Sequence, residues 1–144
     1  MNTFYKLIDD MKSILEDEPG INSVTYGSID DVDLDKFSLF PMAHTMPGNA
    51  SIQDRVIIMN LSIILMDIVD VKKDGIDNEQ DVLNHMLAVA ARFDAEIKRK
   101  EIHRNEYELQ GSIDCEPFVE RFENSLAGYT LTFSVAMKNQ MTSC

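Results

Sequence analysis

The sequence predicts a single α+β domain over residues 1–144, with one mainly antiparallel sheet, a long β-hairpin and two helices packed on the sheet. Three observations lead to this fold class. Residues 56–69 form an apolar run that carries one charge, Asp67. Apolar residues recur at helical spacing near the N-terminus and again after residue 77. Residues 129–136 alternate between apolar and hydroxyl side chains, which is typical of a half-buried strand.

The apolar run at residues 56–69 is the strongest of these signals. It is too short to span a membrane, which needs about 20 apolar residues. Every second side chain from Ile57 to Leu65 is apolar, whereas Asn60 and Ser62 interrupt the other face. We therefore expect a strand buried on one face and covered on the other partly by a helix and partly by a neighbouring subunit. At about 3.3 Å per residue it would reach roughly 45 Å, which suggests an extended hairpin or a sheet continued across subunits.

The N-terminal half is expected to hold one helix and two further strands. A helix is predicted from Thr3 to Asp17, and Pro19 and Gly20 end it. A short strand follows within residues 21–27, then an acidic turn, and residues 37–44 predict a strand bent or placed at an edge by Pro41. Residues 46–49 read as a loop tip, so that residues 46–51 would project as a hairpin arm. The long strand is expected over residues 54–71. The apolar stripe of the first helix comprises Phe4, Leu7, Ile8, Met11, Ile14 and Leu15.

The C-terminal half is expected to hold a second helix and two closing strands. Asp77 can cap this helix, which should end near Lys100. The strands are predicted at residues 106–112 and 129–136. The buried stripe of the second helix would comprise Val82, Leu83, Met86, Leu87, Ala90, Phe93 and Ile97.

The segment between the closing strands, residues 115–128, is dense in apolar and charged side chains. The structural interpretation is a short helix or connection that Phe118, Phe122 and Leu126 fix to the core, while Arg121 pairs with a carboxylate. The functional alternative is a subunit interface, because aromatic residues and arginine are enriched in interfaces.

Composition and charge exclude several classes of function. With 25 acidic against 13 basic residues the net charge is −12, which argues against a basic groove for nucleic acid and against docking on anionic lipid. Residues 1–35 hold nine acidic side chains against two basic ones, and five of the basic residues lie between Arg92 and Arg104. Two cysteines give no disulfide framework, and the first ten residues lack the apolar segment of a signal peptide. An intracellular environment, with no membrane segment, is the expectation.

Catalytic and metal-binding patterns are weak. His44, His85 and His103 stand alone without metal-ligand spacing, and a surface or core-margin role is expected for them. The alternating Asp31, Asp33 and Asp35 resemble the start of a calcium loop, but its glycine and its bidentate glutamate are missing. Neither a phosphate-binding loop nor a nucleophile motif is present. We therefore expect a protein that is not an enzyme and needs no cofactor.

Several runs carry a resemblance to a known group of proteins. They are V-T-Y-G at residues 24–27, D-V-D-L-D-K at 31–36, L-F-P-M-A-H at 39–44, M-D-I-V-D at 66–70 and D-N-E-Q-D-V-L-N at 77–84. Together with residues 115–128 they resemble small virion proteins of tailed phages of Bacteroidota, including the crAss-like phages. The order of helices and strands also resembles the tail terminator (tail completion) family, whose members form rings at the head-proximal end of the tail.

This resemblance implies a tail terminator-like domain that acts as a ring-forming tail terminator or neck subunit at the head–tail junction. The implied partners are further copies in a six- or twelve-fold ring, other neck or tail proteins, and DNA that passes through the lumen without specific binding. The implied location is the virion, assembled in the host cytoplasm. Two alternatives remain: a small acidic protein-binding module acting as a monomer or dimer, and an enzyme with an unrecognised site.

Two sets of residues are candidates for the contacts between subunits. An acidic loop of one subunit would meet a basic segment of the next, and an aromatic and arginine segment would add to the interface. The alternative is that both charged segments are ordinary solvated surface and that the basic one serves only the helix end. An acidic lumen would also repel DNA and let it slide through. The candidates are Asp30, Asp31, Asp33, Asp35, Lys98, Arg99, Lys100, Arg104, Phe118, Arg121 and Phe122.

Overall fold

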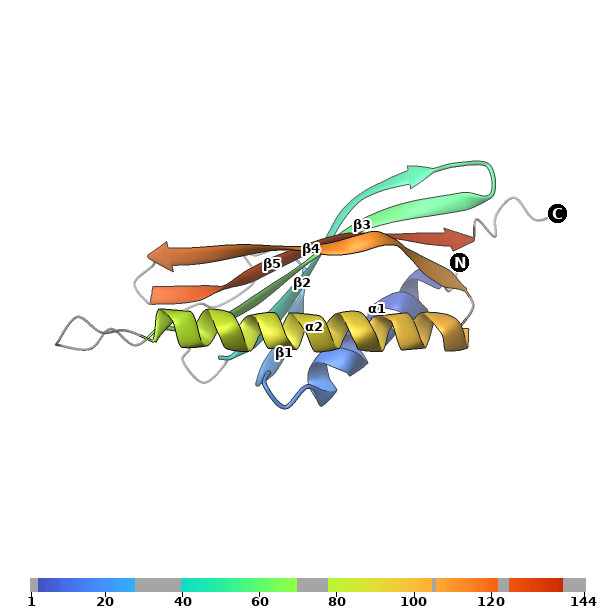
Figure 1. Cartoon of the computed structure of the whole chain (residues 1–144). Coiled ribbons are helices and arrows are strands. Elements are labelled where there is room, and N and C mark those ends of the chain that lie inside the picture. Colours follow the sequence, from blue (N-terminus) through green and yellow to red (C-terminus); the bar gives the residue numbers. More distant parts are fainter. Residues whose placement is uncertain (1–2, 28–39, 70–77, 105, 122–124, 139–144) are drawn as a thin grey trace.

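The protein consists of two layers, a five-stranded sheet and two helices that lie together on one of its faces (Figure 1). The computed structural model describes residues 3–27, 40–69, 78–104, 106–121 and 125–138. The predicted α+β class is confirmed. The elements are α1 (Thr3–Asp17), β1 (Ser23–Tyr26), β2 (Met42–Ile52), β3 (Val56–Ile68), α2 (Glu79–Arg104), β4 (Tyr107–Arg121) and β5 (Ser125–Lys138).

The sheet has the strand order β1-β2-β3-β5-β4, and among these pairs only β1 and β2 run parallel. The long strand β3 lies in the middle. It pairs with β5 along its whole length, from Val56 opposite Lys138 to Ile68 opposite Leu126. On its other side it pairs with β2 from Met66 opposite Met42 to Ile57 opposite Ile52. The predicted extended hairpin is thus formed by β2 and β3.

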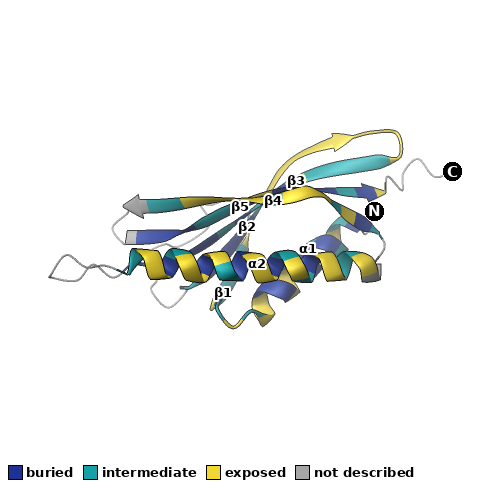
Figure 2. Ribbon diagram, in the orientation of Figure 1, coloured by how far each residue is buried: buried dark blue, intermediate teal, exposed yellow. Residues whose placement is uncertain are grey.

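The two faces of the sheet follow the two parities of β3. Leu61, Ile63 and Leu65 are fully buried and belong to the main core, to which both helices contribute. We call this the helix-covered face, and the face of Asn60, Ser62 and Ile64 the open face. Figure 2 shows the buried side of α2 turned toward the sheet and its exposed side turned away. The helix residues in this core are Leu7, Met11, Ile14 and Leu15 of α1, and Val82, Met86, Val89, Ala90, Phe93 and Ile97 of α2.

No helix among the described residues covers the open face, so the expectation that a helix partly covers it is wrong. At one end this face carries a small apolar cluster formed by Phe40, Met42, Met66 and Leu126. Its middle is polar, and the Ser134 hydroxyl donates a hydrogen bond to Asn60 Oδ1 at 2.5 Å. The helices lie on the other face because the odd-numbered side chains of β3 form the unbroken apolar surface that helices need to bury.

Polar contacts fix the helix layer to the sheet at defined points. The Tyr107 hydroxyl at the start of β4 donates to the buried carboxylate of Asp10 in α1, with 2.7 Å between the oxygens. At the turn after α1, the Arg92 guanidinium donates to both carboxylate oxygens of Glu18, at 2.7–3.1 Å. The Glu18 side chain is only 8% exposed. Its hydrogen bonds with Arg92 tie α2 to the end of α1.

His44, one of the lone histidines, has a structural position that joins β1 to β2. Its side chain is fully buried, and its Nε2 lies 3.0 Å from the carbonyl oxygen of Gly27. A carbonyl oxygen can only accept, so Nε2 carries the hydrogen. Nδ1 then accepts from the Thr25 hydroxyl at 2.6 Å. This arrangement satisfies both ring nitrogens of the histidine.

Several predicted boundaries in the N-terminal half need correction. Residues 46–49 are not a loop tip but part of β2, and the hairpin turns at residues 53–55. The strand continues through a β-bulge near Gly48. Glycine is required at this position because any Cβ would lie only 2.8 Å from the Asn60 carbonyl oxygen. The long strand is shorter than residues 54–71 and ends at Ile68. The predicted strand at residues 37–44 begins only at Met42, and residues 37–39 lie outside the described part.

Corrections in the C-terminal half concern lengths and one face. The segment at residues 115–128 is neither a short helix nor a connection, since β4 continues to Arg121 and β5 begins at Ser125. The predicted strand 106–112 is therefore only the first part of β4. In α2, the prediction that Leu87 is buried is wrong, since it is 44% exposed and Val89 is buried instead. The buried stripe of the helix consists of residues 82, 86, 89, 90, 93 and 97. The helix continues past Lys100 to Arg104.

Candidate functional site

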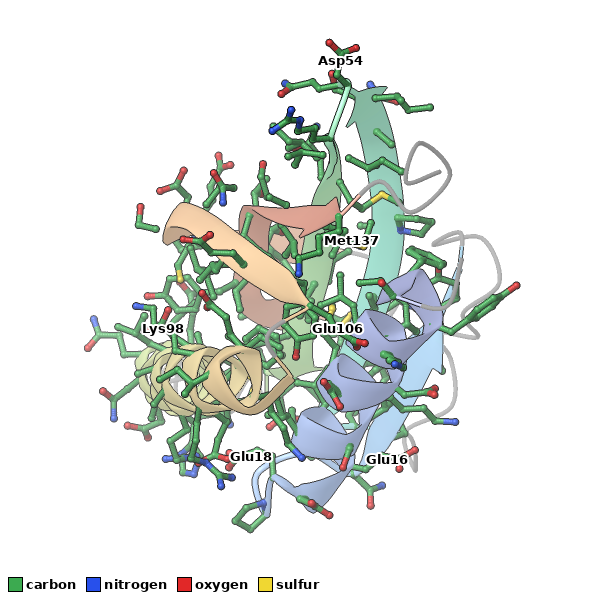
Figure 3. All side chains as sticks on the ribbon, turned by 90° about the vertical axis from the view of Figure 1, so that its right-hand side faces the viewer. Glu16, Glu18, Asp54, Lys98, Glu106 and Met137 are labelled. Carbon is green, nitrogen blue, oxygen red and sulfur yellow. The ribbon has the colours of Figure 1, made fainter. Side chains whose placement is uncertain are left out.

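Among the described residues, the far end of the β2–β3 hairpin is exposed almost throughout, and we call residues 46–55 the arm. Asp54 marks its tip, away from both helices (Figure 3). From Pro47 to Arg55 every residue is exposed, and Ile52 is 75% exposed although it is a large apolar side chain. Within the described residues, β1 pairs with β2 only as far as Thr45. Among the described strands, none pairs with the outer edge of β2 along the arm, and we call this edge the free edge.

The hydrogen-bonding groups at this free edge can be assigned from the ladder. The Gln53 N–H donates to the Val56 carbonyl at 2.8 Å, which makes residues 53 and 56 a hydrogen-bonded pair. Pair types alternate along an antiparallel ladder. The pairs Ile52–Ile57 and Ala50–Met59 are therefore the non-hydrogen-bonded ones, separated by the bonded pair Ser51–Ile58. Ala50 and Ile52 consequently direct their N–H and C=O groups away from β3, outward from the sheet.

The predicted contact residues do not gather into one surface. Lys98 pairs with Asp94 at 3.0 Å and Arg99 pairs with Glu96, so both cations already have a partner on α2 itself. Arg99 and Lys100 line a groove between α1 and α2. Phe118 packs on the apolar cluster of the open face, opposite Gly128. It lies in the half of β4 that ends beside the start of α2, whereas residues 98–100 lie near the helix C-terminus (Figure 1).

The remaining predicted contact residues carry little structural information. Asp30, Asp31, Asp33, Asp35 and Phe122 lie outside the described residues, and so does the acidic turn as a whole. Arg104 ends α2 and Arg121 ends β4, and their backbone positions alone are described. The proposed contact between the acidic turn and the basic segment therefore stays a prediction.

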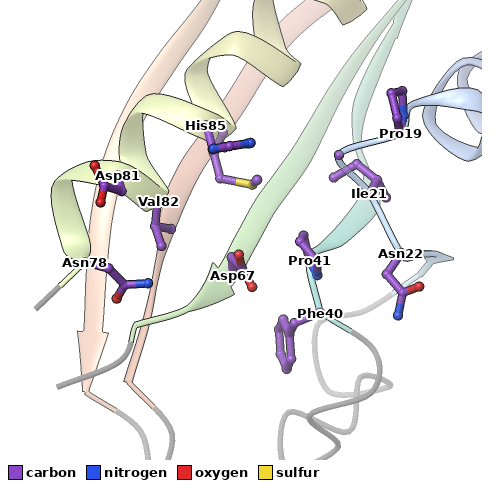
Figure 4. A pocket seen from close by; sticks show the side chains of 12 residues that line it. Pro19, Ile21, Asn22, Phe40, Pro41, Asp67, Asn78, Asp81, Val82 and His85 are labelled. Carbon is purple, nitrogen blue, oxygen red and sulfur yellow. The ribbon is translucent and has the colours of Figure 1, made fainter. Parts of the chain in front are cut away.

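A second candidate site is a cleft between the first turns of α2 and the connection from α1 to β1, with a cavity volume of about 570 Å³. Asp67 of β3 forms its floor, between His85 on one wall and Pro41 and Ile21 on the other (Figure 4). Asp67 occupies this position because it lies on the helix-covered face of β3. It is the next residue on that face after Leu65, which is fully buried under the helices.

The carboxylate of Asp67 is partly removed from water. Burial raises its pKa above the ordinary aspartate value, whereas the hydrogen bond from the Ile68 N–H and the electrostatic influence of the nearby His85 side chain lower this pKa. The Ile68 N–H lies 2.8 Å from Asp67 Oδ1. The loss of hydration of the charged carboxylate therefore outweighs the contacts that stabilise it. Carboxylates with a pKa shifted in this way are common at functional sites.

Sequence reasoning missed this cleft, although Asp67 gave a signal. It is the only charge in the fourteen-residue apolar run. His85 was interpreted as a surface or core-margin residue, and its side chain is indeed exposed. Their proximity depends on the pairing of layers, because eighteen positions of chain separate the two residues and only the packing of α2 against β3 brings them together.

Among the residues that the structure describes, no group of three or more His, Cys, Asp or Glu side chains is placed to hold a metal ion. In the same part of the chain, no helix combines the length and apolar character needed to cross a membrane. A scan against models of known protein families finds none that matches the chain. A search of curated proteins likewise finds no match.

Proposed function

We propose that this chain is a structural, non-enzymatic subunit of a tailed-phage virion, assembling in the host cytoplasm into a ring of the tail terminator or neck type. The observation that carries the proposal is the arm, residues 46–55, with its free outer edge. The resemblance of the sequence runs to small virion proteins supports the biological setting. The two-layer α+β fold with a long hairpin is compatible with that family.

The physical reason is that an exposed sheet edge favours pairing with another chain. Monomeric proteins shorten, bend or charge such edges. The arm carries a bulge and Pro47, which limit pairing near its base, but its last part presents outward N–H and C=O groups at Ala50 and Ile52. Ile52 also adds a large exposed apolar side chain. A head-to-tail contact made by this edge can repeat around an axis and close a ring, because its two surfaces differ.

The charge distribution is suited to a channel for DNA. On the open face, β4 presents the exposed side chains of Glu108, Asp114 and Glu116, and the described part of this face has a single exposed cation, Lys138. A ring whose lumen is lined by this face would repel phosphates and would bind DNA weakly. A net charge of −12 per subunit makes the whole assembly repel DNA in the same way.

The experiment compares assembly of wild-type protein with that of variants at the free edge, by light scattering after size exclusion and by native mass spectrometry. Ala50→Pro removes one outward donor and should abolish or strongly weaken ring formation. Proline is tolerated at an edge position whose N–H faces solvent, so the fold should persist. Ala50→Val, which keeps the N–H, is the matched control and should assemble like wild type.

A second pair of variants tests the exposed apolar side chain. Ile52→Lys should weaken assembly, since lysine on a free edge opposes strand pairing. Leu87→Lys places the same charge on a 44% exposed residue of α2, far from the arm, and should leave assembly unchanged. Rings of equal stability for Ala50→Pro, Ile52→Lys and wild type would refute the role of the arm.

A specific observation also supports a second function, a small acidic module that binds another protein as a monomer or dimer. That observation is the cleft at Asp67, which is open to solvent and does not involve the arm. A protein that stays monomeric or dimeric under all assembly conditions, yet binds a partner through the cleft, would favour this second function over the ring.

A further inference from the structure

The cleft between α2 and the α1–β1 connection has the size and lining of a site for a side chain or a small ligand. Its volume of about 570 Å³ lies within the usual range of ligand pockets, roughly 300–1,000 Å³. Apolar side chains on both walls, among them Ile21, Pro41 and Val82, can pack along an aliphatic stem. The Arg92–Glu18 pair lies outside the lining, but it ties α2 to the residue before Pro19, which belongs to the opposite wall.

The charges of the lining select the kind of ligand. Asp67 lies at the floor, Asp81 is exposed at the rim, and neither lysine nor arginine lines the cleft among the described residues. His85 is the one basic side chain of the lining. An anion would meet two carboxylates here, which outweigh the attraction of the nearby helix N-terminus because Asp81 already sits in its first turn. The lining therefore favours a cation.

Asp67 gives a second reason why the lining favours a cation. Its carboxylate is half-buried and accepts one described hydrogen bond, from the Ile68 N–H to Oδ1. A carboxylate can accept several more. No lysine or arginine pairs with this carboxylate among the described residues, and burial raises the pKa of Asp67 more than the Ile68 N–H and His85 lower it. A guanidinium or ammonium group would satisfy the open acceptor positions and compensate the charge.

We propose that this cleft binds the guanidinium or ammonium group of a basic side chain presented by a partner protein, with Asp67 as the recognising carboxylate. The aliphatic stem of that side chain packs between the apolar walls, and its charged head reaches the floor. This site does not depend on the arm or on ring formation, so the two proposals can fail separately.

The test uses the full chain and small probes in a titration followed by NMR. The probe is N-acetyl-L-arginine amide, whose only charge is the guanidinium. The control probe is N-acetyl-L-citrulline amide, which has nearly the same shape without the charge. The amide signals of Ile68 and His85 report binding in the cleft. Butane-1,4-diamine is a third probe, because a free diamine could supply the same cationic chemistry without a protein side chain.

Three variants assign the binding to residues. Asp67→Asn keeps an oxygen that can accept from the Ile68 N–H and so should fold, but it should weaken binding of the arginine probe about tenfold or more. Asp81→Asn, at the exposed rim, should weaken binding about twofold to threefold. Asp9→Asn removes one exposed carboxylate on α1, outside the cleft, and is the control for net charge. It should leave binding unchanged.

The expected result is saturable binding of the arginine probe, no saturable binding of the citrulline probe, and loss of binding in Asp67→Asn alone among the floor and control variants. A thermal melt without probe supplies an independent readout, since Asp67→Asn should raise the melting temperature by removing a half-buried charge. Equal binding of both probes, equal binding by Asp67→Asn, or an absence of cleft shifts at millimolar probe would overturn the proposal. Tighter binding of butane-1,4-diamine than of the arginine probe would overturn the assignment to a protein side chain.

Discussion

Gly128 is the position at which the central strand pair is most sensitive to a single added carbon. It lies buried in β5 opposite Met66 of β3. A Cβ at this position would lie 1.7 Å from the carbonyl oxygen of Leu65, 2.8 Å from its carbonyl carbon and 3.0 Å from the Met66 Cα. All three atoms belong to the backbone of β3. The substitution Gly128→Ala therefore cannot be accommodated by rotation of a side chain.

The size of the effect follows from this geometry. Carbon and oxygen in adjacent strands settle at about 3.3 Å, so the strands would have to separate locally by roughly 1.6 Å. Overpacking costs about 1–3 kcal/mol, and separation of the strands weakens neighbouring ladder bonds worth about 0.5–1.5 kcal/mol each. We expect a loss of about 3–5 kcal/mol in the free energy of unfolding. For a chain of this length that corresponds to a fall of roughly 10 °C or more in the melting temperature.

Urea unfolding followed by circular dichroism measures this loss, with Gly111→Ala as the matched control. Gly111 has a φ of +71° at the bulge of β4, and a Cβ there meets nothing within 4 Å. Its substitution carries only the cost of a left-handed backbone, about 1–2 kcal/mol. If Gly128→Ala were no more destabilising than Gly111→Ala, the register of β3 on β5 would be wrong. The positions of both the arm and Asp67 depend on that register.

Two further predictions concern the contacts between the layers. Tyr107→Phe removes the hydroxyl that donates to buried Asp10 and should lower the free energy of unfolding in urea by about 1–2 kcal/mol. Tyr5→Phe, at a 68% exposed position, is the control and should change it by close to nothing. Equal effects of the two variants would contradict the buried hydrogen bond. The Arg92 guanidinium lowers the pKa of Glu18, chiefly by hydrogen bonding, so this pair stabilises the fold above the ordinary glutamate range and the stabilisation is lost as the pH falls through the lowered pKa. Arg92→Met should therefore be less stable than wild type by about 1 kcal/mol at neutral pH. Urea unfolding at a series of pH values should show that this difference in stability disappears below about pH 4. A difference that persists in acid would contradict its assignment to the Arg92–Glu18 pair.

The elements that the sequence predicted well are those whose signal is local. The boundaries of α1 are confirmed at Thr3 and Asp17, because a regular apolar stripe and the Pro19-Gly20 stop both act within a few residues. The β2–β3 hairpin was predicted because a long apolar run has few other ways to be buried. The parity of β3 also assigned its buried face correctly, since Leu61, Ile63 and Leu65 are fully buried.

The features that sequence reasoning missed depend on contacts between distant parts of the chain. Residues 115–121 were not predicted as a strand because they mix apolar and charged side chains and include Pro117. The structure nevertheless pairs them with β5 along an edge of the sheet. Pro47 and Gly48 looked like a turn, but they belong to β2, where a bulge lets Gly48 approach Asn60 of β3. The cleft at Asp67 arises only once α2 and the α1–β1 connection pack on the same face, which no short pattern encodes.

The oligomeric state of the wild-type chain tests the central claim most directly. Native mass spectrometry and negative-stain microscopy should show a closed ring, and six copies of the 16.4 kDa chain would give about 98 kDa, twelve copies about 197 kDa. Ala50→Pro should reduce this species to single subunits that keep the wild-type circular dichroism spectrum. A wild-type chain that remains monomeric even at millimolar concentration, or a ring that Ala50→Pro leaves intact, would contradict assembly through the free edge of the arm.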